Sequence, residues 1–171
     1  MQGCVQIYTG NGKGKTTASA GLALRAVGAG MRVFIGQFIK NKDSAEMKLL
    51  RERCPEVDIV QFGAGGFITS TPSGNDLEKA HNGIEHLRNA LACDDYDMVI
   101  ADEILGALSA GVVTLDEITT LIAERPSHLE LIFTGRNAPQ EIIEKADLVT
   151  EMNCIKHYYD KGVQARKGIE F

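Results

Sequence analysis

The sequence lacks tryptophan and has few aromatic residues, prolines and cysteines. Its four cysteines, Cys4, Cys54, Cys93 and Cys154, lie far apart along the chain. They form neither a C-x-x-C pair nor a Cys/His cluster at the spacing of a zinc site. The sequence therefore predicts buried free thiols and excludes a cysteine-based metal site.

Other absences narrow the class of protein. No apolar run approaches the ~18 residues of a membrane helix, and the chain opens on a strand with no signal peptide, so we expect a cytoplasmic protein with no membrane partner. The net charge is −5, whereas nucleic-acid-binding proteins are usually basic, so we expect no nucleic-acid partner. The 171 residues, 44% of them hydrophobic, suit one domain spanning residues 1–171.

A glycine-rich loop follows the first apolar segment. Residues 5–17 read VQIYTGNGKGKTT, a short strand and then a loop that ends in Gly14, Lys15 and Thr16. Glycines allow positive φ and bring N–H groups up to phosphate oxygens, and the helix that follows adds its positive end. The lysine supplies a mobile charge and the threonine a ligand for Mg²⁺. This pattern predicts a phosphate-binding loop; the alternative is a glycine-rich turn that holds no ligand.

The loop departs from the G-x-x-x-x-G-K-[ST] pattern at one position. Thr9 stands where the first glycine is expected. Because a β-branched residue disfavours positive φ, we expect an altered loop entrance in which Gly10 makes the turn.

Apolar strands and amphipathic helices alternate along the chain. This alternation predicts an α/β fold of the P-loop NTPase-like (RecA-like) type, with a mostly parallel sheet and helices on both faces. A loop is expected at residues 63–74, and the tail at residues 153–171 is polar, basic and without a clear period. The expected strands are residues 5–8, 32–39, 57–62, 97–101, 129–134 and 148–151; the expected helices are residues 16–29, 44–53, 76–92, 104–109, 115–124 and 139–145.

Two acids end one of the expected strands. Asp102 and Glu103 follow an apolar run, and P-loop proteins hold Mg²⁺ with the loop threonine and such an acid. The alternative is that both acids only cap the helix that begins at residue 104. Arg136 follows another strand and could contact phosphate or form a surface ion pair. All these residues fall at the carboxyl ends of strands, where parallel sheets bind ligands.

Further motifs accompany the loop: GQFIK at residues 36–40, TGR at 134–136, ADLVTEM at 146–152, IKH at 155–157 and KGVQARKGIEF at 161–171. Together with TGNGKGKTT at residues 9–17 and the acids at 102–103, they resemble the P-loop type ATP:corrinoid adenosyltransferases, which act on cob(I)alamin or cob(I)yrinic acid a,c-diamide. The similarity spans nearly the whole chain. Threonine in place of the first glycine is typical of that family.

The resemblance implies a particular reaction. The cobalt of a corrinoid, reduced to Co(I), attacks the 5′ carbon of ATP, the adenosyl group moves to cobalt and triphosphate leaves. This step belongs to adenosylcobalamin biosynthesis or salvage. The nucleophile comes from the corrinoid, so no protein nucleophile or base is needed. A flavoprotein reductant and a homodimer are further expectations from the family.

The resemblance also implies roles for individual residues. Lys15, Thr16 and Glu103 would be catalytic, and Thr16, Asp102 and Glu103 would hold Mg²⁺. Phe67 would contact the corrinoid; some members carry a tryptophan two residues later, where this chain has Thr69. The residues expected to bind ATP are Gly10, Asn11, Gly12, Lys13, Gly14, Lys15, Thr16, Thr17 and Arg136.

Two other functions compete with adenosyl transfer. Most P-loop enzymes transfer or hydrolyse the γ-phosphate, so a small-molecule kinase or an NTPase is the main rival. A nucleotide-dependent sensor or corrinoid carrier that binds without turnover is the second. Release of intact triphosphate would indicate adenosyl transfer, release of ADP would indicate phosphoryl transfer, and absence of turnover would favour the sensor.

Overall fold

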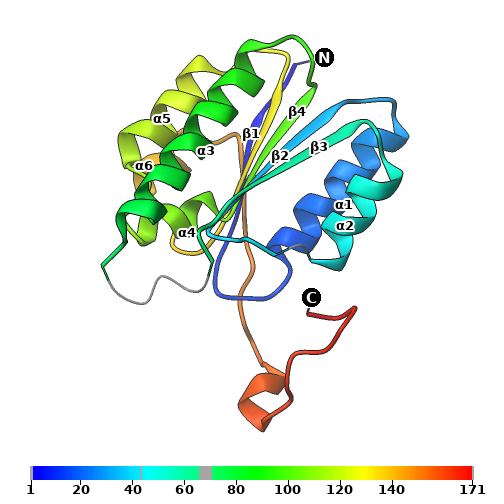
Figure 1. Ribbon diagram of the computed structural model, residues 1–171, viewed down its shortest axis with the longest axis vertical. Coiled ribbons are helices and arrows are strands. Elements are labelled where there is room, and N and C mark those ends of the chain that lie inside the picture. Colours follow the sequence, from blue (N-terminus) through cyan, green and yellow to red (C-terminus); the bar gives the residue numbers. More distant parts are fainter. Residues whose placement is uncertain (1, 43, 66–70, 171) are drawn as a thin grey trace.

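The computed structural model describes residues 2–42, 44–65 and 71–170, and within these ranges six strands form one sheet (Figure 1). Every neighbouring pair of strands is parallel, in the order β3-β2-β4-β5-β1-β6. The strands are β1 (Val5–Thr9), β2 (Val33–Phe38), β3 (Val57–Phe62), β4 (Met98–Asp102), β5 (Glu130–Thr134) and β6 (Leu148–Glu151).

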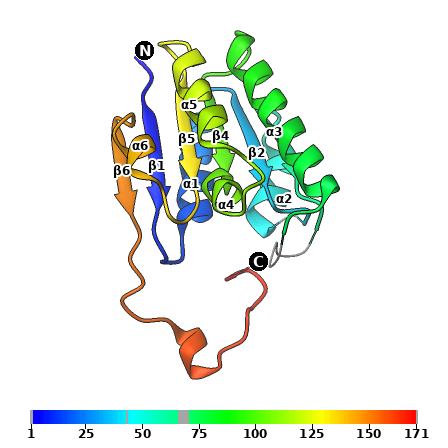
Figure 2. The ribbon, with the colours of Figure 1, turned by 90° about the vertical axis from the view of Figure 1, so that its left-hand side faces the viewer.

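Helices cover both faces of the sheet. Helices α1 and α2 lie on one face, and α3, α4, α5 and α6 lie on the other (Figures 1 and 2). The expected α/β fold with a parallel sheet and helices on both faces is therefore confirmed. The helices are α1 (Lys15–Gly28), α2 (Ala45–Arg53), α3 (Gly74–Ala92), α4 (Ile104–Ser109), α5 (Leu115–Glu124), α6 (Gln140–Ile143) and the 3₁₀ helix η1 (Tyr158–Lys161).

The middle of the sheet is buried on both sides. All residues of β2 and β4 are buried, as expected for parallel strands that helices cover on both faces. One core cluster lies under α3, α4 and α5 and includes Phe38 and Leu87; the other lies under α1 and α2 and includes Ile35 and Met47. Strand β4 therefore carries its last residue, Asp102, into the centre of the protein.

The predicted element ends differ from the structure by up to two residues, for identifiable reasons. Helix α3 begins at Gly74 because Ser73 caps it and Asp76 completes a reciprocal capping box. Strand β2 ends one residue early because Ile39 has a φ of 64°. The helix expected at residues 139–145 is only four residues long, with Pro139 as its N-cap.

One expectation about the rest of the chain was wrong in part. The cysteines are free as predicted, but Cys4, Cys54 and Cys93 are only half-buried and Cys154 is exposed. The tail also contains the short 3₁₀ helix η1, whose four residues are too few to produce a periodic pattern in the sequence. No helix in the described part of the chain is long and apolar enough to cross a membrane.

The packing of α3 on the sheet predicts opposite effects for two glycines. A Cβ at Gly83 would come within 2.7 Å of the Phe38 ring, whereas a Cβ at Gly21 in α1 meets nothing within 4 Å. We expect Gly83→Ala to lower the free energy of unfolding by about 1–3 kcal/mol. Gly21→Ala should raise it by up to about 1 kcal/mol, because alanine favours the helix. Urea unfolding of both variants measures this, and equal effects would contradict the packing.

Candidate active site

The glycine-rich loop joins the end of β1 to the start of α1. Thr9 is the last residue of β1, and Gly10 makes the turn with a φ of 96°, so the expected entrance is confirmed. Gly14 has a φ of 116° and is the N-cap of α1. The Thr9 hydroxyl accepts a hydrogen bond from the Ala138 N–H (3.3 Å), which ties the loop to the segment after β5.

The Lys15 side chain folds back into the loop. Its ammonium donates to the carbonyl oxygens of Gly10 (2.7 Å) and Gly12 (2.8 Å), and the residue is 8% exposed. Burial lowers the pKa of Lys15, and the Glu103 carboxylate counteracts part of that effect. Because these two partners are neutral carbonyls, the positive charge is available to an anion on the loop.

Asp102 lies at the centre of a hydrogen-bonded network and is fully buried. Its Oδ1 accepts from the hydroxyls of Thr16 (2.9 Å) and Thr134 (2.7 Å). Its Oδ2 accepts from the Lys40 ammonium (2.8 Å) and the Gln37 amide (3.0 Å). Burial pushes the pKa of Asp102 up, but the Lys40 charge and these hydrogen bonds outweigh it and hold that pKa below its usual value. The carboxylate is therefore ionised and directed at the loop.

Glu103 adopts a left-handed backbone with a φ of 60°, which costs an ordinary residue about 1–3 kcal/mol. Its N–H donates to the Thr134 hydroxyl (2.9 Å), and its side chain lies beside Gly106 and lines the cavity above the loop. It stands at the N-cap position of α4 but makes no side-chain capping bond. The Asp102 carboxylate is bonded elsewhere, so helix capping does not account for these two acids.

The donor set gives Mg²⁺ a partial set of ligands, which nucleotide phosphates and waters would complete. The described residues hold no group of three His, Cys, Asp or Glu side chains that could bind a metal alone. Mg²⁺ in nucleotide sites takes one or two carboxylates, substrate phosphates and waters. The Thr16 hydroxyl, which bonds to Asp102, and the nearby Glu103 carboxylate match that partial set.

A cavity of about 990 Å³ lies over the loop and is large enough for a nucleotide. Gly10 and Asp102 lie beneath it, as buried supports. Arg136, at the end of β5, is exposed on its wall close enough to Lys15 to affect that residue's pKa. The expected site residues that line it are Asn11, Gly12, Lys13, Gly14, Lys15, Thr16, Thr17, Glu103 and Arg136.

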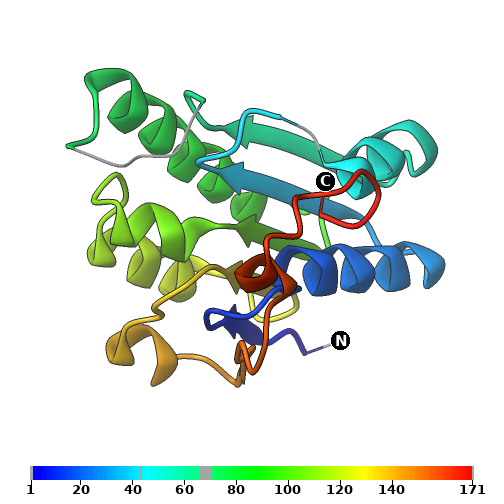
Figure 3. The same ribbon diagram turned by 90° about the horizontal axis from the view of Figure 1, so that it is seen from below.

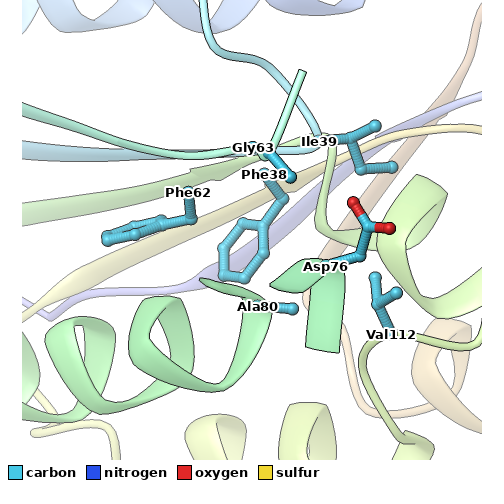
Figure 4. A pocket seen from close by; sticks show the side chains of 8 residues that line it. Phe38, Ile39, Phe62, Gly63, Asp76, Ala80 and Val112 are labelled. Atoms are coloured by element: carbon cyan, nitrogen blue, oxygen red, sulfur yellow. The ribbon is translucent and has the colours of Figure 1, made fainter. Parts of the chain in front are cut away.

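Phe67, expected to contact the corrinoid, lies outside the described residues. A second pocket lies where β2, β3 and α3 meet, between Phe38, Phe62 and Val112 (Figure 4). Its volume of about 10 Å³ holds at most one water molecule, so this pocket is no ligand site by itself.

Met152 and the tail that follows it also belong to the site, which our reading of the sequence missed. The Gly12 N–H donates to the Met152 carbonyl (2.6 Å), and the Met152 N–H donates to the Thr9 carbonyl (2.8 Å). A Cβ at Gly10 or Gly12 would come within 2.6 Å of the Met152 oxygen. These glycines therefore leave room for the Met152 backbone, and the chain continues from there as the tail, across the edge of the sheet that carries the loop (Figure 3).

Lys13 anchors the far end of the tail. Its ammonium donates to the Tyr158 hydroxyl (2.9 Å), the Ile169 carbonyl (2.7 Å) and the Glu170 carboxylate (2.9 Å). Arg166 also pairs with Glu170 (3.2 Å) and stacks on the Tyr158 ring, 4.9 Å from its centre. The tail is thus closed into a loop over the cavity. The motif at residues 161–171 is the signal that could have indicated this.

These features define a class of protein. The loop after β1, with Lys15 and Thr16 opening α1, faces a buried acid at the end of β4, two strands away in a parallel sheet. This is the arrangement of a P-loop nucleotide-binding protein.

Comparison with known proteins narrows the class to a family. Residues 1–171 match the family model described as ATP:corrinoid adenosyltransferase BtuR/CobO/CobP. Proteins named corrinoid adenosyltransferase from Pseudomonas aeruginosa and Escherichia coli K12 are 36% and 37% identical to 99% of this chain, which covers 84% and 86% of their lengths. The corrinoid adenosyltransferase CobA of Salmonella typhimurium is 36% identical over the same share. The chain belongs to this family of enzymes, which transfer an adenosyl group from ATP to a corrinoid.

The network predicts a structural role for Thr134. Thr134→Val keeps the shape but removes one donor to Asp102 and the acceptor for the Glu103 N–H. We expect the free energy of unfolding to fall by about 1–3 kcal/mol, the cost of leaving buried polar groups unpaired. Thr120→Val on the exposed face of α5 is the control and should change it by less than about 0.5 kcal/mol. Urea unfolding compares them, and equal losses would contradict the network.

Proposed function

We propose that this chain transfers the 5′-deoxyadenosyl group of ATP to the Co(I) of a corrinoid and releases triphosphate. One observation supports the proposal beyond family membership: cationic side chains line a cavity, and an acidic side chain of the kind that binds Mg²⁺ lies beneath it. Lys15 and Arg136 line that cavity, and Asp102 bonds to Thr16 beneath it. Such a site suits a reaction in which the protein holds a leaving group and the substrate supplies the nucleophile.

The loop holds the triphosphate in this proposal. The loop N–H groups other than that of Gly12, which bonds to Met152, bind phosphate oxygens together with the start of α1, and Lys15 and Arg136 supply positive charge. Negative charge grows on the triphosphate as the bond to the 5′ carbon breaks. Preorganised cations at that position stabilise the transition state more than the ground state.

Thr16, Asp102 and Glu103 would hold Mg²⁺ beside the phosphates, where the ion neutralises the charge of the leaving group. Burial and hydrogen bonds from four side chains hold the Asp102 carboxylate in the orientation that this role requires. The Thr16 hydroxyl donates its hydrogen to Asp102 and keeps a lone pair for the metal.

The remaining assignments rest on the sequence. The resemblance implies that Phe67 contacts the corrinoid, which would be cob(I)alamin or cob(I)yrinic acid a,c-diamide, and it implies a homodimer whose corrinoid is reduced by a flavoprotein. The length and composition of the sequence imply one domain and the cytoplasm.

An anaerobic assay tests the reaction. The protein is mixed with Mg·ATP and chemically reduced cob(I)alamin, or with the reduced diamide, and both absorbance and phosphate products are followed. A light-sensitive alkylcobalt product with an equal amount of triphosphate is expected. ADP without alkylcobalt would replace the proposal with a kinase or NTPase. ATP binding without product from either corrinoid would replace it with a nucleotide sensor.

Lys15→Ala tests the loop. The variant loses the cation nearest the leaving phosphates, so we expect the turnover number to fall by about 100-fold or more. Lys48→Ala, on the exposed side of α2, is the matched control and should keep wild-type activity. The adenosylation rate at saturating ATP measures both. Wild-type activity in Lys15→Ala would remove the loop from the mechanism.

The acids predict a change in metal dependence. Asp102→Asn and Glu103→Gln preserve volume but remove a negative charge, so at least one should raise the Mg²⁺ concentration for half-maximal rate by about tenfold. The measurement is rate against free Mg²⁺ at saturating substrates. If neither variant changes that concentration, the acids serve the structure rather than the metal.

A further inference from the structure

Lys40 stands between two of the side chains assigned to the metal. Its ammonium lies 2.8 Å from Asp102 Oδ2 and 3.1 Å from Thr16 Oγ1. The Thr16 hydroxyl has one hydrogen, which it donates to Asp102 Oδ1 (2.9 Å). Its oxygen therefore accepts from Lys40 through a lone pair of the kind that a metal would use. Lys40 and a metal ion thus need the same atoms.

The backbone before Lys40 is bent sharply to place it there. The Lys40 N–H donates to the Phe38 carbonyl (2.7 Å), and Ile39 between them has a φ of 64°. A γ-turn with positive φ is strained, and more so at a β-branched residue. Such strain persists only where the surroundings enforce it, and it gathers at functional sites.

The surroundings of this turn do enforce it. The Gly63 N–H donates to the Lys40 carbonyl (3.0 Å), and a Cβ at Gly63 would collide with the backbone of Ile39 and Lys40. The Ile39 side chain lines the small pocket near Asp76 and Val112 (Figure 4). The turn is therefore clamped on both sides, and the direction of Lys40 is built into the fold.

Charge explains why this position needs a cation. Asp102 is fully buried, and a buried carboxylate is costly unless it is paired. Lys40 supplies the pair, yet its side chain is 33% exposed and it lines the cavity above the loop. A lysine on a flexible stem can leave such a position when another cation takes over.

We propose that Lys40 is a resident cation, which occupies the metal position between Thr16 and Asp102 in the nucleotide-free protein and competes directly with Mg²⁺. This inference rests on the metal site of the proposed function. Lys40 acts as a positioning residue: it pairs with the Asp102 carboxylate and holds it in place until the metal arrives with ATP. The ammonium then moves into the cavity, on the side where the triphosphate binds.

Metal binding to the nucleotide-free full chain tests the proposal without ATP or corrinoid. Mn²⁺, which is visible by electron paramagnetic resonance, is titrated into the wild type, Lys40→Met, Lys40→Arg and Lys48→Met. Removing the competing cation should tighten Mn²⁺ binding by Lys40→Met about tenfold or more. Lys40→Arg keeps the charge and should behave like the wild type. Lys48→Met removes an exposed lysine of α2 and should also behave like the wild type.

Thermal unfolding gives a second readout. Lys40→Met leaves Asp102 buried without its cation, so its melting temperature should fall, and Mg²⁺ should restore it while leaving the wild type unchanged. Mn²⁺ affinity in Lys40→Met that equals or falls below the wild-type value would overturn the proposal. So would equal tightening in Lys48→Met, which would indicate a general charge effect. Adenosyl transfer by the wild type is unaffected by either result, so the two proposals fail separately.

Discussion

The fully buried Asp102 carboxylate is the constraint on which the rest of the site depends. A buried ionised carboxylate is stable only if its oxygens accept hydrogen bonds, and here four side chains donate to them. These side chains come from α1, β2, the turn after β2 and β5. Ordering one carboxylate thus orders four segments and sets the distance from the glycine-rich loop to the proposed metal position.

The conformation of the loop serves two kinds of contact. Gly10 and Gly12 give the backbone the freedom that phosphate binding needs, but they also admit the Met152 carbonyl, which approaches too closely for any side chain. The tail is then anchored through Lys13. One set of glycines therefore couples the nucleotide pocket to the last residues of the chain. A substitution in the tail is therefore expected to affect ATP binding, although the tail lies far from the loop in sequence.

Local charge in the site opposes the charge of the whole molecule. The chain carries a net charge of −5, yet Lys15, Lys40 and Arg136 face one cavity. Neutral carbonyls hold Lys15, and Asp102 balances Lys40. Such a site favours a polyphosphate with its metal and requires no nucleophile from the protein, in agreement with the family to which the chain belongs.

The alternation of apolar strands and amphipathic helices, the glycine-rich loop and the acids after β4 are local patterns, and the sequence alone therefore established the parallel α/β fold and the loop entrance at Gly10. The exact ends of the helices and strands were harder to predict, because a capping box at Ser73 and a strained residue at Ile39 shifted them. Only the tertiary structure brought Lys40, Thr134 and the tail to the site. Their partners lie 24 to 157 residues away along the chain, and no periodicity or spacing encodes such contacts. Packing decides them, because a buried charge accepts whichever donors the folded chain brings within reach.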